Sequence, residues 1–273
     1  MKRTLCRSFA LVGLCAALAT AQAQPSWPAP AESPKINRPL PFKAGETLRY
    51  EVTFSKLIFG GTVGDVKLSV AGGESAKSPR LTIKAELASK GFFPKLFGIK
   101  VRDTYSATVN AQDLGLQESF RSLAEGNNRR EQKAVIDRDT GRVTFTERNL
   151  ADKKAEPKTK ETPSPAWIQD ILSAMYFVRT QPLNEGNVIE IPISDAGELY
   201  HIEVIAEKPE EVKVDAGKFK TIRLNAKIFD GRFIRRSGEM LLWVSDDARR
   251  IPVRARLKFS GATVTVDLKR IQS

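Results

Sequence analysis

Two adjacent carboxylates, Asp246 and Asp247, are followed closely by two adjacent arginines, Arg249 and Arg250. Carboxylate oxygens could hold a hard metal ion, and guanidinium groups could bind an anion. A calcium site needs several more oxygen ligands, and none lies at a telling spacing nearby. The four residues stand between two runs of alternating apolar and polar residues, where short polar side chains are typical of a turn. The pattern therefore predicts a hairpin between two strands.

A second acidic run, DRDTG at residues 137–141, is similar to the start of a calcium-binding loop. Its glycine is the fifth residue, whereas an EF-hand loop needs glycine at its sixth position, so another hairpin turn is predicted. His201 is the only histidine, and no nucleophile or metal motif accompanies it. We predict no catalytic residue, no metal ligand and no cofactor. A pair of carboxylates that hydrolyses a glycan stays open, although the sequence selects no pair.

The segment GFFPKLFG at residues 91–98 places four large apolar side chains between two glycines at a connection between strands. Connections are usually polar and exposed. This segment could be a plug over one end of the core, the mouth of an apolar ligand cavity, or a patch that touches a membrane or a partner. The ligand hypothesis names Phe92, Phe93, Leu96 and Phe97 of this loop, together with Trp167, Ile171 and Met175.

The N-terminal segment has the features of a secretory signal. Three basic residues precede a short apolar run at 9–18, and an A-x-A pattern ends at Ala23. Residues 1–23 are therefore predicted to be a signal peptide that exports the protein to the periplasm, with a retained N-terminal anchor as the alternative. Both cysteines, Cys6 and Cys15, lie in this segment, so the exported chain is expected to have neither disulfides nor thiol chemistry, and no transmembrane helix.

The formal net charge is +12, and it falls to +9 when the three basic residues of the signal are removed. Such a charge favours anionic partners such as lipid headgroups or acidic polysaccharide, and it also serves solubility. The basic residues are spread along the strands, and export argues against nucleic acid as a partner.

The exported chain divides into a tether and one domain. Residues 24–44 contain six prolines and are predicted to be an extended, proline-rich tether. Residues 45–273 are predicted to form a single β-rich domain, because apolar and polar residues alternate in many short runs. Within it, the charged segment 151–163 is expected to be an exposed loop. The apolar spacing of three and four over 165–180 predicts one helix.

Three stretches together resemble a known bacterial family. They are GETLRY at 45–50, DILSAMYFVR at 170–179 and WVSDDARRIPV at 243–253, supported by VRDTY at 101–105. In combination they are similar to domain-of-unknown-function family 3108, found in exported envelope proteins, over residues 42–271. The resemblance implies an exported, β-rich bacterial envelope protein, and it supplies no reaction and no site residue.

The predicted fold is mainly β: an antiparallel sheet, curved or half-closed like a barrel, with one central helix at about 165–180 on its concave side. This outline resembles periplasmic lipoprotein carriers, which hold acyl chains in an unclosed barrel. We therefore predict a non-enzymatic periplasmic protein that binds an apolar or lipid-like ligand. The alternatives are a structural or adaptor protein that binds anionic envelope polysaccharide or a protein partner, and a carboxylate-based glycan hydrolase.

Overall fold

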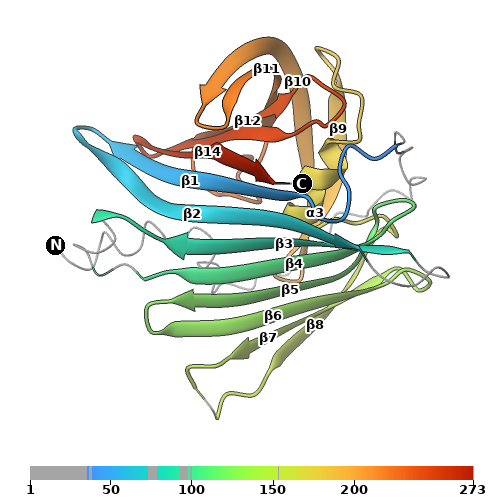
Figure 1. Cartoon of the computed structure of the whole chain (residues 1–273). Coiled ribbons are helices and arrows are strands. Elements are labelled where there is room, and N and C mark those ends of the chain that lie inside the picture. Colours follow the sequence, from blue (N-terminus) through green and yellow to red (C-terminus); the bar gives the residue numbers. More distant parts are fainter. Residues whose placement is uncertain are drawn as a thin grey trace.

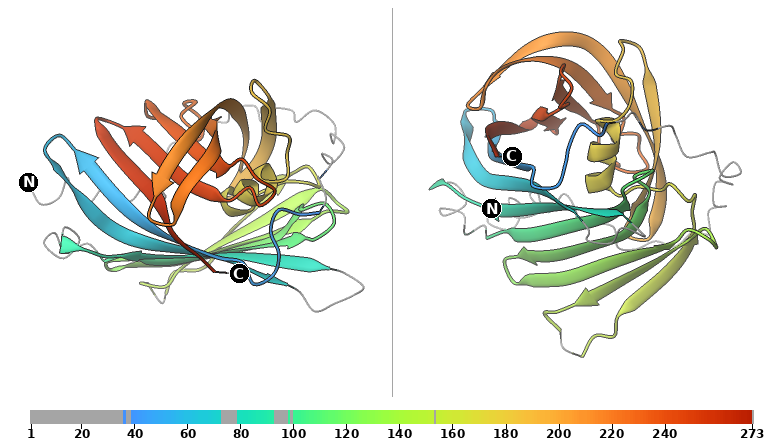
Figure 2. Two further views of the ribbon diagram at one scale, coloured as in Figure 1. Left: turned by 45° about the horizontal axis from the view of Figure 1, so that its top comes forward. Right: turned by 45° about the vertical axis from the view of Figure 1, so that its right-hand side comes forward.

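The computed structural model describes residues 36, 39–72, 79–92, 98, 100–152 and 154–272. Within these ranges, fourteen strands form one antiparallel sheet, and the helix α3 (Ile171–Val178) lies inside its curve (Figures 1 and 2). The strands before the helix are β1 (Thr47–Lys56), β2 (Phe59–Gly72), β3 (Arg80–Ser89), β4 (Arg102–Asn110), β5 (Leu116–Glu125), β6 (Asn128–Asp137), β7 (Arg142–Asn149) and β8 (Lys158–Pro163). Those after it are β9 (Val188–Asp195), β10 (Glu198–Val214), β11 (Gly217–Ala226), β12 (Gly238–Ser245), β13 (Pro252–Phe259) and β14 (Ala262–Gln272).

The sheet consists of two meanders that meet where the first strand pairs with the last. Its order is β8-β7-β6-β5-β4-β3-β2-β1-β14-β13-β12-β11-β10-β9, and β1 pairs antiparallel with β14. The edge strands β8 and β9 share no ladder, so the sheet is curved but not closed (Figure 2). This architecture confirms the predicted fold class.

The helix is shorter than its sequence pattern predicts. It begins after Asp170, whose carboxylate accepts a hydrogen bond from the backbone N–H of Ser173 at 2.7 Å, while the Ser173 hydroxyl accepts one from the backbone N–H of Asp170 at 3.0 Å. This reciprocal cap fixes the start of the helix. The preceding residue, Gln169, bridges Ile193 of β9 in a parallel pair, and that use of its backbone prevents a helix from starting at 165. The helix ends at Val178, with Arg179 as its C-cap.

The prediction of an exposed loop at 151–163 is wrong at its C-terminal end, where the chain forms β8 on the edge of the sheet. Edge strands tolerate charged side chains because one side of the strand faces water. Lys160 forms an ion pair with Glu198, and Arg142 of β7 lies 3.5 Å from Glu161.

Two apolar clusters fill the curve, and α3 lies between them. Leu172 and Tyr176 belong to the cluster formed mainly by the strands of the N-terminal half, whereas Phe177 and Val178 belong to the cluster formed by β9 to β12. The helix is therefore the shared core of both halves.

Two predictions about the N-terminal region stay predictions. The expected signal peptide at 1–23 lies outside the described residues, and so does most of the expected tether at 24–44. In the part of the chain that is described, no helix has both the length and the apolar character needed to cross a bilayer.

Candidate functional site: the concave face of the sheet

A band of partly exposed apolar side chains crosses the concave face. Direct cross-strand pairing joins Val66 to Leu87, and Val264 to Leu257. A further row runs across four strands from Val52 through Val266 and Ala255 to Leu242. Directly paired residues of antiparallel strands project from the same face. We call this set the apolar band: Val52, Val66, Leu87, Tyr105, Leu242, Ala255, Leu257, Val264 and Val266, all of intermediate burial.

The apolar band adjoins the core, but its side chains are only partly buried, whereas the core residues are buried. Val66, Leu87, Tyr105 and Val266 pack against the cluster that contains Leu172 and Tyr176. The helix α3 contacts β3, β4 and β9, so it covers only part of the concave face. Burial falls along β1 from Leu48, which is fully buried in the cluster that contains Tyr176 of α3, to the partly exposed Val52, which lies outside that cluster.

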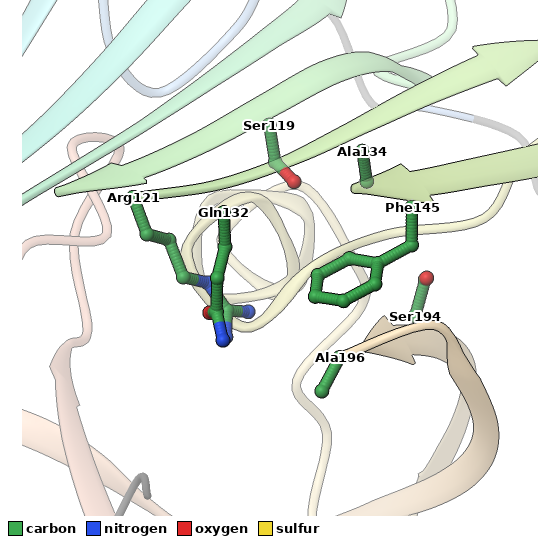
Figure 3. Close-up of a pocket in the computed structure, with 7 residues that line it drawn as sticks. All are labelled: Ser119, Arg121, Gln132, Ala134, Phe145, Ser194 and Ala196. Atoms are coloured by element: carbon green, nitrogen blue, oxygen red, sulfur yellow. The ribbon is translucent and has the colours of Figure 1, made fainter. Parts of the chain in front are cut away.

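A small polar pocket lies where the two edges of the sheet approach each other. Figure 3 shows Arg121, Gln132 and Phe145 extending from β5, β6 and β7 toward Ser194 and Ala196 near the β9–β10 turn. Ser119 and Ala134 complete the lining.

Contacts made by the β9–β10 turn hold the two edges of the sheet close to each other. The Thr162 hydroxyl of β8 donates a hydrogen bond to the carbonyl of Gly197 at 2.8 Å, and Arg121 lies 2.5 Å from Asp195. Gly197 has a φ of 76°, and a Cβ there would lie 3.2 Å from the Phe145 ring, so glycine permits the close contact.

Burial and charge set the electrostatics of this pocket. Burial lowers the pKa of the Arg121 guanidinium, but the negative charges of Asp195 and Asp170 outweigh it, and the net pKa is raised. Burial raises the pKa of Asp170, and the charge of Arg121 together with the hydrogen bonds from Ser173 opposes this rise. Arg121 also lies 5.8 Å from the ring centroid of Tyr105, in the apolar band. Arg121 therefore stays charged and acts as the cation for two carboxylates.

The size of the pocket argues against a ligand-binding role. Its free volume is about 10 Å³, roughly the room that one water molecule needs. The side-chain oxygen of Gln132 is buried there without a hydrogen-bond partner among the described residues, and a water molecule would suit it. We therefore assign the pocket to the closure of the sheet, and we assign the candidate site to the apolar band.

A second buried cation, Arg179, joins distant parts of the chain at the end of α3. Its guanidinium donates to both carboxylate oxygens of Glu46, at 2.7 and 2.8 Å, and to the carbonyl of Arg249 at 3.0 Å. It also lies over the rings of Phe42 and Tyr176, at 4.9 and 4.8 Å from their centroids. Bidentate pairing and ring contacts compensate for the cost of burying the charge.

The three stretches that carry the family resemblance meet at Arg179. Glu46 comes from GETLRY, Arg179 ends DILSAMYFVR, and Arg249 belongs to WVSDDARRIPV. Tyr50 of the first stretch also donates its hydroxyl to the carbonyl of Pro252 at 2.9 Å. These contacts therefore hold the three stretches together in the fold.

The two acidic runs are hairpin turns, as the sequence predicts. Between β12 and β13, Asp247 accepts hydrogen bonds from the Ser245 hydroxyl and from the backbone N–H groups of Arg249 and Arg250. Between β6 and β7, Asp137 accepts from the backbone N–H groups of Asp139 and Thr140, at 3.0 Å each, and these bonds lower its pKa.

The single histidine lies beside one carboxylate and belongs to no metal-binding group among the described residues. His201 is partly exposed, and its Nε2 lies 3.4 Å from the exposed Glu190. No group of three or more histidine, cysteine, aspartate or glutamate residues in the described ranges could hold a metal ion.

Four of the seven residues of the ligand hypothesis lie in the described part of the chain, and they differ in their surroundings. Phe92 is 69% exposed, and Phe93, Leu96 and Phe97 lie outside the described residues. Trp167 is buried against Phe177, with ring centroids 6.0 Å apart. Ile171 is 48% exposed on α3, and Met175, one turn later, packs against the core from a partly buried position.

Sequence reasoning missed the residues of the apolar band as a site. Their alternation is visible in the sequence, and it predicts their strands and their face correctly. What the alternation does not indicate is which apolar positions remain partly exposed, because that depends on where the helix lies.

Comparisons with solved structures support the fold. A β-barrel-like protein of domain-of-unknown-function family 1849 from Brucella abortus is similar, with a TM-score of 0.53 and 10% identity over 84% of this chain and 97% of that chain. An exported protein with a YmcC-like fold from Bacteroides fragilis matches with a TM-score of 0.34 and 11% identity over 86% of this chain and 98% of that chain. A lipoprotein from Parabacteroides distasonis has a TM-score of 0.30 and 8% identity over 84% of this chain and 95% of that chain.

No curated protein matches the chain. The family model described as "Protein of unknown function (DUF3108)" matches residues 49–269, nearly the whole sheet and the helix within it. The chain therefore belongs to the DUF3108 family.

Proposed function

We propose that the protein is a non-enzymatic component of the bacterial cell envelope that holds an apolar, lipid-like molecule against the concave face of its half-open sheet. The observation that carries the proposal is the apolar band, whose large side chains remain partly exposed inside the curve. A concave, mostly apolar surface is typical of a site for an apolar ligand. The signal-like segment at 1–23 supports a periplasmic location.

We also keep the loop at 91–98 as the proposed entrance to this site. Just before it, the backbone N–H of Lys90 donates to the carbonyl of Val63 at 2.9 Å, so the loop leaves the sheet beside β2. Phe92, Phe93, Leu96 and Phe97 are the proposed contacts there, and Ile171 and Met175 of α3 are the proposed wall deeper inside. Trp167 would act through its packing on Phe177.

The test places a charge in the apolar band. The double variant Leu87→Glu/Leu257→Glu should bind a fluorescent fatty acid at least about tenfold more weakly, because the ligand would have to desolvate a carboxylate. Val135→Glu is the matched control, since Val135 is exposed on the opposite face of β6 from the core residues Ala134 and Ile136. Melting temperatures of all variants, measured in parallel, separate loss of binding from loss of fold.

Native mass spectrometry of gently purified protein gives the independent readout. Repeated recovery without a bound lipid, together with no binding of the fluorescent fatty acid, would refute the proposal. Binding that falls steeply with salt would point to the polysaccharide or adaptor alternative, because apolar contacts are insensitive to screening.

A further inference from the structure

The tip of the β1–β2 hairpin exposes three consecutive large apolar side chains. Lys56 pairs with Phe59, so Leu57 and Ile58 form the two-residue loop. Leu57 and Ile58 are each 91% exposed, and Phe59 is 64% exposed. The pairing of β2 with β3 starts only at Gly64, so the tip extends beyond its neighbour, as Figure 1 shows.

This composition is unusual for such a turn. Two-residue hairpin loops favour glycine, asparagine or aspartate, because the chain needs positive φ there. Leu57 has a φ of 53°, so a bulky residue occupies a position that suits glycine. Consecutive exposed apolar residues typically mark a surface that is covered in use.

Unpaired cations lie on the hairpin and on the segments that flank it on both sides. Lys56 precedes it, and the adjoining row of pairs runs from Lys56 through Ala262 and Phe259 to Gly238. Arg235 and Arg236 lie in the loop immediately before Gly238. On the other side, Lys100 adjoins the end of β3 through the bond from the Ser89 N–H to the Val101 carbonyl. The four cations are Lys56, Lys100, Arg235 and Arg236, all exposed and none within ion-pair distance of a carboxylate in the described ranges.

We propose that this end of the sheet docks on an anionic lipid surface. Leu57, Ile58 and Phe59 enter the boundary between headgroups and acyl chains, and the four cations bind the negative headgroups. The combination of an apolar tip with a basic rim is typical of proteins that bind the membrane interface. A lipid surface fits better than a protein groove, because the rim carries unpaired charge of one sign and the whole chain has a net charge of +12.

Vesicle flotation with the purified protein tests the docking surface. Vesicles of phosphatidylglycerol and phosphatidylethanolamine should bind the protein, and vesicles of phosphatidylcholine alone should bind it weakly. The triple variant Leu57→Ser/Ile58→Ser/Phe59→Ser should reduce the vesicle affinity at least about tenfold, since three apolar side chains no longer enter the lipid. Val135→Ser, which removes an exposed apolar side chain from β6, is the matched control and should bind as the unmodified protein does.

A second variant tests the basic rim, the name we give to the four cations Lys56, Lys100, Arg235 and Arg236. Lys56→Gln/Arg235→Gln/Arg236→Gln should lower the affinity for phosphatidylglycerol vesicles about tenfold at low salt, and the difference should shrink as salt screens the charges. Lys84→Gln/Lys208→Gln is the control, because both lysines are exposed without a carboxylate partner in the described part of the chain and lie away from the tip.

Three outcomes would overturn the proposal. The first is that phosphatidylglycerol vesicles and phosphatidylcholine vesicles bind the protein equally or not at all. The second is that the tip variant and Val135→Ser lose binding to the same extent. The third is a dimer in solution that the tip variant dissociates, which would identify the tip as a contact between copies of the chain. None of these outcomes depends on whether the apolar band binds a ligand.

Discussion

At the scale of single residues, Leu57 keeps a conformation that its side chain disfavours. Its φ of 53° lies in the left-handed region, where a side chain costs roughly 1–2 kcal/mol relative to the right-handed region. Ile58 has the same exposed fraction of 91% but is not among the described residues with positive φ. Substitutions at these two positions therefore distinguish the effect of backbone strain from the effect of surface exposure.

Glycine substitutions at these two positions should have opposite effects on stability. Leu57→Gly should raise the free energy of unfolding by about 1 kcal/mol, and the melting temperature by about 2–4 °C, because glycine adopts positive φ freely. Ile58→Gly should lower the free energy of unfolding by roughly 0.5–1 kcal/mol, since it only adds freedom to the unfolded chain. Denaturant titration measures both. A less stable Leu57→Gly variant would contradict the strain, and tighter vesicle binding by it would contradict the docking surface.

At the scale of elements, the β9–β10 turn contacts the opposite side of the open sheet, although no β-ladder joins the two edges. The β9–β10 turn reaches β5 and β8 through the ion pair of Arg121 with Asp195 and the hydrogen bond from Thr162 to Gly197. The negative charge of Asp170, the N-cap of α3, also raises the pKa of Arg121. One cation of β5 is thus paired with the turn and interacts electrostatically with the start of the helix.

Because of this shared role, we expect substitution of Arg121 to destabilise the protein more than substitution of Asp195. Arg121→Leu should cost about 3–5 kcal/mol, because it leaves Asp195 and the buried Asp170 without a cation. Asp195→Asn should cost clearly less, because Arg121 still interacts electrostatically with Asp170. The cost of Arg121→Leu should shrink as the pH falls toward 3.8, the ordinary carboxyl pKa, because the buried Asp170 carboxylate, whose pKa burial raises, then takes up a proton. Denaturant titrations at neutral and acid pH check this, and equal costs for the two variants would argue against the shared role.

At the scale of the whole molecule, the buried Tyr50 and Tyr176 and the partly buried Tyr105 make stability depend on alkaline pH. Burial is the largest cause that raises the pKa values of Tyr50, Tyr105 and Tyr176 above the ordinary value of 10.0. Above pH 10.0 the unfolded chain releases these protons while the folded chain retains them. The folded state then binds more protons than the unfolded state, so the free energy of unfolding falls as the pH rises.

The loss should begin near pH 10.0 and amount to about 1.4 kcal/mol per pH unit for each tyrosine that stays protonated in the folded state. Tyr105→Phe should reduce this slope by one proton, since phenylalanine cannot ionise. Denaturant titrations across the alkaline range measure the slope. A slope that Tyr105→Phe leaves unchanged would show that the Tyr105 hydroxyl ionises in the folded protein.

Local patterns in the sequence predicted the elements well. The alternation around Leu48 and Tyr50, and around Ile189 and Ile191, indicates strands with one buried face, and the structure confirms them. The turn at Asp246 and Asp247 was also predictable, because side chains there bond to backbone groups only two or three residues away. Such interactions join residues that are close in the sequence, so local sequence patterns are enough to predict them.

The candidate site was less predictable, because it depends on which parts of the sheet are covered by other elements of the fold. Leu48 and Val52 lie on the same strand and are both apolar, yet Leu48 is fully buried and Val52 is not. Leu48 belongs to the core cluster that contains Leu172 and Tyr176 of α3, and Val52 does not. The position of α3 in turn depends on the reciprocal cap at Asp170 and on the pairing of Gln169 with Ile193. The β8 edge strand was missed for a related reason, since its charged sequence becomes a strand only beside β7.

Local patterns are enough to specify a chain of alternating strands with one amphipathic helix, because side-chain burial repeats with the period of each element. Long-range contacts settle that the sheet stays open, that a turn bridges its edges, and that Arg179 pairs with Glu46, a residue 133 positions away. A buried charge must find a partner wherever the folded chain provides one, and spacing along the sequence does not specify which carboxylate will be there.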